Sequence, residues 1–121
     1  MSAGHTVTTR PSTAHVEVHL DGELLASSDR ALELDETGLP TRYYLPREDV
    51  RMDLLTRTEL HTRCPFKGEA SYWSVEVGGV RHDDVVWSYE TPKANVAEIA
   101  EHLCFYPNRV QLTVDRVPVE R

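Results

Sequence analysis

The side chains most able to do chemistry lie in one short segment, Arg63-Cys64-Pro65-Phe66-Lys67-Gly68. It combines a thiol with two cationic side chains and a rigid proline. Because nearby cations stabilise a thiolate, Arg63 and Lys67 could make Cys64 a catalytic nucleophile or a redox thiol. The alternative is that Cys64 is a small buried residue and that the proline and glycine only form a turn. The sequence alone leaves both interpretations open.

A second group of residues is aromatic and lies along the segments around this loop. Its members are Tyr43, Tyr44, Tyr72, Trp73, Trp87, Tyr89, Phe105 and Tyr106. Neighbours on a strand point to opposite faces, so one residue of each adjacent pair can line an interior, whereas Trp87 and Tyr89 share a face. The alternative is a plain aromatic core.

These two groups together predict an aromatic-lined pocket around the Cys-Pro-x-Lys-Gly loop. Arg42, Arg47 or Lys67 at its rim would suit a small anionic or planar ligand. The ligand-binding residues that we predict are Arg30, Tyr44, Lys67, Tyr72, Trp87 and Tyr89.

Three functional hypotheses follow from these residues. The first is a domain that binds an unknown small molecule in this pocket. The second is an enzyme in which Cys64 is the nucleophile or the redox thiol. The third is a protein-interaction module, such as a homodimer, that pairs through an exposed strand edge.

Histidines and carboxylates give weaker signals. His61 lies three residues before Cys64, and His82 could approach through a hairpin. Zinc needs three or four such ligands in a tetrahedron, and this spacing is too loose to predict a metal site. We expect no cofactor. Arg30 is more simply read as the ion-pair partner of Glu36 or Asp49 than as part of a catalytic carboxylate site.

The elements that must position these residues are mostly strands. Asp21-Gly22 and Gly78-Gly79 each predict a hairpin, because both turn positions need a positive φ. Further alternating segments bring the total to about seven to nine short strands. Two short helices are expected, over residues 46–55 and from Asn95 to about Leu103. Residues 1–11 are expected to form a flexible tail and residues 12–121 a single, mainly β domain, either a barrel or two packed sheets.

Composition limits the class of protein. The chain has 121 residues, 40% of them hydrophobic and 27% charged, and a net charge of −7. This size and balance are typical of one globular domain. The acidic charge argues against nucleic acid and anionic membranes as partners. With no apolar run of about 20 residues and no signal-peptide core, we expect no membrane span and a cytoplasmic location, where the two cysteines would be free thiols.

Several motifs together resemble a known family. They are Ala26-Ser27-Ser28-Asp29-Arg30-Ala31-Leu32, the segment Tyr43-Tyr44-Leu45-Pro46-Arg47-Glu48-Asp49-Val50, the run from Thr62 to Trp73, Trp87-Ser88-Tyr89-Glu90-Thr91-Pro92 and the run from Ile99 to Tyr106. The chain is similar from about Val16 to Val114 to the bacterial and fungal domain of unknown function 427, sometimes labelled nucleotidyltransferase-like.

This resemblance implies a compact, mostly-β fold of the β-tent or Mss4-like kind. It carries no established activity and no residue roles. The chain contains no Gly-Ser pair, which nucleotidyltransferases usually need, and Asp83-Asp84 would point to opposite faces of a strand. It also contains no Cys-x-x-Cys pair, so the structural zinc of related architectures is not expected.

Overall fold

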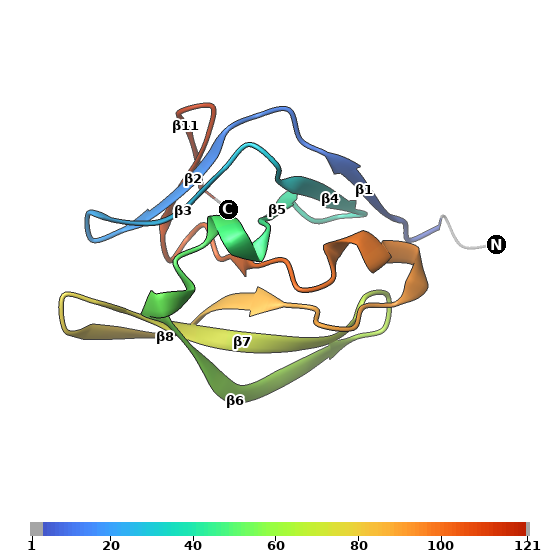
Figure 1. Ribbon diagram of the computed structural model, residues 1–121. Helices are drawn as coiled ribbons and strands as arrows, with labels where there is room; N and C mark the ends of the chain where they lie inside the picture. The colour runs from blue at the N-terminus through green and yellow to red at the C-terminus, as the bar shows by residue number, and fades with distance from the viewer. Residues whose placement is uncertain (1–3, 121) are drawn as a thin grey trace.

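Short antiparallel strands joined by tight turns build almost the whole molecule. The computed structural model describes residues 4–120 and contains three sheets (Figure 1). The first sheet has the order β1 (Val7–Pro11), β4 (Leu32–Glu36), β5 (Arg42–Tyr44). The second has the order β11 (Val117–Val119), β10 (Gln111–Val114), β2 (Val16–Leu20), β3 (Glu23–Ser28). The third has the order β6 (Leu55–Cys64), β7 (Gly68–Val77), β8 (Val80–Ser88), β9 (Cys104–Phe105).

Both predicted hairpins are confirmed. The β2–β3 turn is Asp21-Gly22, with φ angles of 50° and 83°. The β7–β8 turn is Gly78-Gly79, with φ angles of 58° and 79°. Glycine adopts a positive φ without steric cost, and aspartate tolerates it better than most residues, so these turns follow directly from the local sequence.

The mostly-β single domain is confirmed, but the predicted barrel is wrong. In a barrel every strand pairs on both sides, whereas each sheet here is open. The outermost strands are β1 and β5 of the first sheet, β11 and β3 of the second, and β6 and β9 of the third. Among residues 4–120, two isolated β-bridges, Ala26↔Val50 and Leu45↔Leu103, extend pairing beyond the strands. In Figure 1 the long strands β6, β7 and β8 lie along one side, and the other two sheets lie across from them.

The helical segments are shorter and tighter than predicted. They are 3₁₀ turns: η1 (Arg47–Asp49), η2 (Met52–Leu54) and η3 (Ala94–Ile99). None has a side-chain cap, and Val96 interrupts η3 with a φ of −133°. Within residues 4–120, no helix is long and apolar enough to cross a membrane.

The boundary of the predicted N-terminal tail is also wrong, because residues 7–11 form strand β1. This strand pairs with β4 from Val7↔Glu36 to Pro11↔Leu32, and Arg10 forms ion pairs with Glu33 and Asp35. Cross-strand pairing therefore ties this polar segment to the domain. Residues 1–3 of the predicted tail lie outside the described residues.

Two hydrophobic clusters form the core. The first lies between the second and third sheets and includes Val18 and Trp73. The second lies between the first and third sheets and includes Tyr44 and Tyr72. Tyr43 packs against the first cluster, so each adjacent aromatic pair divides between the two clusters as the alternation predicts.

Candidate functional site

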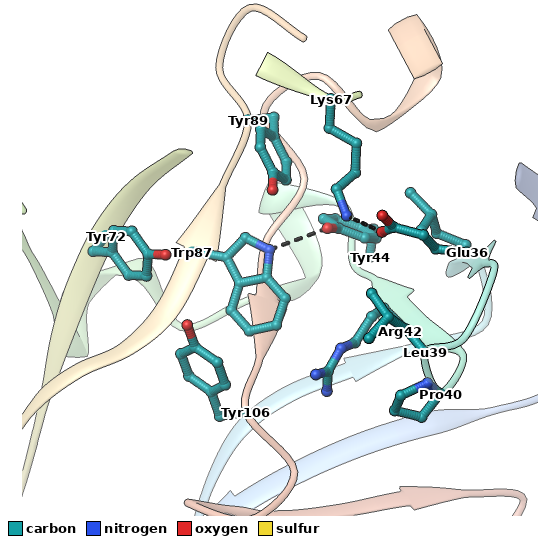
Figure 2. Close-up of a pocket in the computed structure, with 11 residues that line it drawn as sticks. Glu36, Leu39, Pro40, Arg42, Tyr44, Lys67, Tyr72, Trp87, Tyr89 and Tyr106 are labelled. Atoms are coloured by element: carbon teal, nitrogen blue, oxygen red, sulfur yellow. Dashed lines mark hydrogen bonds and ion pairs between the residues drawn. The ribbon is translucent and has the colours of Figure 1, made fainter. Parts of the chain in front are cut away.

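A pocket opens where the first and third sheets meet at the second cluster. Its volume is about 180 Å³. It is lined by Leu34, Glu36, Leu39, Pro40, Arg42, Tyr44, Lys67, Tyr72, Trp87, Tyr89 and Tyr106 (Figure 2). Apolar rings therefore form one part of its wall and charged side chains another.

Strand alternation and register place the walls of this pocket. Arg42 and Tyr44 are two residues apart on β5, so their side chains project from the same face. On the opposite wall, Tyr72 of β7 pairs directly with Trp87 of β8. Tyr89 follows β8 at the same alternation as Trp87. Sequence spacing thus explains how the two strand walls face each other.

The short turn between β6 and β7 positions Lys67. The backbone N–H of Lys93 donates to the carbonyl of Lys67 at 2.9 Å, which docks the turn on a neighbouring loop. The following Gly68 has a φ of 115°, a conformation that side-chain-bearing residues rarely adopt. The turn thereby directs a largely buried lysine side chain into the pocket (Figure 2).

Aromatic contacts link the two sheets across the pocket. The indole Nε1–H of Trp87 donates to the hydroxyl of Tyr44 at 3.0 Å, and the two rings meet edge to face at 6.3 Å. Tyr106 lies against the other side of Trp87, with ring centroids 4.4 Å apart. A buried indole N–H needs such an acceptor, so this hydrogen bond fixes the orientation of the ring.

A buried ion pair forms one side of the pocket. The ammonium of Lys67 contacts the carboxylate of Glu36, and their side chains are only 10% and 7% exposed. The imidazole Nε2 of His5 lies 2.8 Å from the second carboxylate oxygen. Lys67 also lies over the ring of Tyr89, 5.8 Å from its centroid. The positive charge of Lys67 is therefore balanced by Glu36.

Arg42 is the pocket cation without such a balance. Its guanidinium carbon lies 5.5 Å from the Trp87 ring centroid, in a cation–π contact. Its Nη1 is buried and, within residues 4–120, has no hydrogen-bond partner. A buried donor without an acceptor costs about 1–3 kcal/mol, and more when charged. An anion in the pocket would remove this cost.

The ionisation of the pocket follows from burial and from these partners. Burial raises the pKa of Tyr44 well above its ordinary value and also raises those of Tyr89 and Tyr106, so the phenols remain neutral donors and acceptors. Burial acts to raise the pKa of Glu36 as well. The hydrogen bonds from Lys67 and His5 outweigh it, and the pKa lies below its ordinary value. Glu36 is therefore ionised at neutral pH.

The pocket is lined by most of the residues predicted for the site, namely Tyr44, Lys67, Tyr72, Trp87 and Tyr89. Two other predicted residues do not line it, and each is placed by a different local interaction.

Cys64 is half-buried and packs against the second cluster, and it does not line the pocket. Its carbonyl accepts the backbone N–H of Lys67 at 3.2 Å, while the Lys67 ammonium contacts Glu36. Both cysteines are free, and burial raises the pKa of Cys104 to about 12.

Arg30, the other predicted ligand-binding residue, is exposed and lies outside the pocket. Its guanidinium forms ion pairs with Asp49 at 3.2 Å and Glu48 at 3.6 Å. This matches the simpler interpretation of Arg30 as an ion-pair partner, with Asp49 rather than Glu36 as the partner.

Several lining residues were missing from the predicted ligand-binding set. Arg42 had been assigned to the rim and Tyr106 to the aromatic group, whereas Leu39 and Pro40 gave no functional signal. Glu36 shares a face of β4 with Leu34, and this alternation is the signal that could have placed it in the pocket.

Among residues 4–120, no group of three or more His, Cys, Asp or Glu side chains is placed to hold a metal ion. The fold and the site together define a small domain of three antiparallel sheets with a charged, aromatic pocket between two of them.

The chain belongs to a family of unknown function, DUF427, whose model carries the label NTP_transf_9 and matches residues 8–116. No curated protein matches the chain. The family confirms the resemblance seen in the sequence motifs and leaves the function to be argued from the pocket.

Proposed function

We propose that the protein binds a small, planar anion in the pocket between the first and third sheets. The observation that carries this proposal is the buried Nη1 of Arg42, which has no acceptor within residues 4–120. Lys67 and Glu36 neutralise each other, so Arg42 leaves the pocket with an excess positive charge. A guanidinium presents two parallel N–H groups that match a carboxylate or a phosphate.

The aromatic wall supports a planar ligand. The rings of Trp87, Tyr44 and Tyr89 line the same pocket as Arg42 and present both apolar faces and hydroxyl groups (Figure 2). Planar ligands stack on such rings, and hydroxyls fix their orientation.

The volume limits the size of the group that enters. A cavity of about 150 Å³ accepts benzene, whereas sites for drug-sized ligands usually measure roughly 300–1,000 Å³. At about 180 Å³ the pocket is suited to one six-membered ring and a small anionic group. Benzoate and phenyl phosphate are therefore suitable first probes, with benzyl alcohol as an uncharged match.

The proposal is tested by fluorescence in a Trp73→Phe variant, where Trp87 is the remaining tryptophan. We expect saturable quenching by benzoate or phenyl phosphate and at least tenfold weaker binding of benzyl alcohol. Replacing Arg42 with Gln should weaken binding of the anions by about 10–100-fold, because a charge-assisted hydrogen bond contributes about 1.5–3 kcal/mol. Arg63→Gln is the matched control, since Arg63 is exposed and lies outside the pocket.

If neither anion changes the Trp87 fluorescence or raises the melting temperature at millimolar concentration, the proposal is wrong. Equal binding to the Arg42→Gln variant and to the parent would remove Arg42 as the anchoring residue.

A further inference from the structure

A second cavity adjoins the proposed binding pocket. It has a volume of about 450 Å³ and is lined by Leu39, Pro40, Arg42, Tyr106, Asn108 and Glu120. The first four of these residues also line the smaller pocket. The two cavities therefore share one wall, and Arg42 is the charged residue of that wall.

The two cavities together have the size of a complete ligand site. The inner pocket alone lies below the roughly 300–1,000 Å³ that such sites usually show, while the combined volume lies within it. The inner pocket accommodates one ring and a small anionic group but nothing larger. A larger ligand must extend past Arg42 and Tyr106 into the outer cavity.

The position of Arg42 restricts where the ligand's charge can lie. In Figure 2 the Arg42 side chain lies between Trp87 and Pro40, with its guanidinium toward Tyr106. An anion bound to this guanidinium lies at the junction of the two cavities. A carboxylate ends a molecule, whereas a phosphodiester carries its charge in the middle and has a substituent on each side.

The outer cavity has a different polarity from the inner one. The inner pocket holds an ion pair and an excess cation, whereas the outer cavity adds the carboxylate of Glu120 and the amide of Asn108. A carboxylate accepts hydrogen bonds and favours a positive charge. The substituent that enters the outer cavity should therefore carry an ammonium or another hydrogen-bond donor.

We infer that the ligand is a singly charged aryl phosphodiester, with its ring on Trp87, its phosphate at Arg42 and a donor-bearing substituent beside Glu120. This inference rests on the proposed function, because it assumes that the inner pocket binds the planar anion. To that function it adds a second part of the site in the outer cavity and a phosphate in the middle of the ligand. It also adds a hydrogen-bond donor on the substituent that enters the outer cavity.

The test compares three phosphodiesters with the same ring and the same phosphate charge. Methyl phenyl phosphate has almost no extension, 2-hydroxyethyl phenyl phosphate has a neutral donor, and 2-aminoethyl phenyl phosphate has an ammonium. Affinity is measured by Trp87 fluorescence in the Trp73→Phe protein. We expect the aminoethyl ester to bind at least tenfold more tightly than the methyl ester, with the hydroxyethyl ester between them.

Variants assign the gain to the outer cavity. Glu120→Gln and Asn108→Ala should remove most of the gain from the extension and leave the affinity for methyl phenyl phosphate unchanged. Arg42→Gln should weaken all three esters. Glu101→Gln is a matched control for Glu120→Gln, because Glu101 is exposed and lies in neither cavity.

The outcomes separate this inference from the proposed function. If all three esters bind equally, the outer site is wrong and the planar-anion site stands. If the aminoethyl ester gains affinity equally in the Glu120→Gln variant, the assignment of its ammonium to Glu120 is overturned. If benzoate, phenyl phosphate and all three esters fail to bind, the proposed function and this inference fail together.

Discussion

The buried ion pair between Lys67 and Glu36 gives the sharpest prediction about stability. Replacing Lys67 with Met removes the ammonium but keeps an unbranched apolar side chain of similar length. Glu36 would then be left as a buried carboxylate, 7% exposed, with the His5 imidazole as its remaining side-chain partner. Breaking a buried pair in this way costs about 3–5 kcal/mol, and the contact with His5 favours the lower end.

The assay is urea unfolding of the Lys67→Met, Glu36→Gln and double variants. At about 4 °C per kcal/mol for a chain of this length, Lys67→Met should also lower the melting temperature by about 12 °C. The double variant should be more stable than Lys67→Met alone, because no buried charge is left unpaired. Arg10→Gln is the exposed control and should cost less than about 1 kcal/mol, since Arg10 is 58% exposed.

The pH dependence gives an independent check on Glu36. Its pKa is lower in the folded protein than in the unfolded chain, where the ordinary value is 4.5. The stability that this shift contributes is therefore fully present above about pH 4.5 and is lost as the pH falls through the lower, folded-state pKa. Glu36→Gln should flatten this part of the acid stability curve. Two results together would refute the reasoning. Lys67→Met would be as stable as Arg10→Gln, and Glu36→Gln would lose stability at low pH just as the parent protein does.

Three further predictions concern individual contacts. Tyr44→Phe should cost about 1–3 kcal/mol in urea unfolding, because the indole N–H of Trp87 loses its buried acceptor, and an undiminished melting temperature would contradict this. Gly68→Ala should destabilise by about 1–3 kcal/mol because of the φ of 115°, whereas ordinary thermal stability would show that the turn can relax. In the native protein a thiol reagent should label Cys64 and reach Cys104 only on unfolding, and equal labelling of both would contradict the burial of Cys104.

Local features of the fold were predictable, because they depend on neighbouring residues. Asp21-Gly22 and Gly78-Gly79 dictate their turns wherever the flanking strands lie. The alternation of Tyr72 and Trp73 likewise fixed that their rings serve different clusters. The helical segments were located correctly but proved to be 3₁₀ turns, since a pattern of apolar residues does not reveal which hydrogen bonds close so short a segment.

The grouping of strands into three sheets could not be predicted. It depends on pairings between distant segments, such as β1 with β4 and β10 with β2, which alternation does not specify. The same limit explains Arg30. Arg30 was predicted both as a ligand-binding residue and as an ion-pair partner of Glu36 or Asp49, and the turn at residues 47–49 places Asp49 beside it.

The pocket itself arises from how the first and third sheets are joined. The second and third sheets meet through apolar side chains that fill the space between them. The first and third sheets are also held by directional polar contacts, Trp87 to Tyr44 and Lys67 to Glu36. Such contacts fix the distance between sheets without filling the volume around them, and a cavity remains. A ligand bound there would contact both sheets and stabilise the folded protein, so the same polar junction determines both binding and stability.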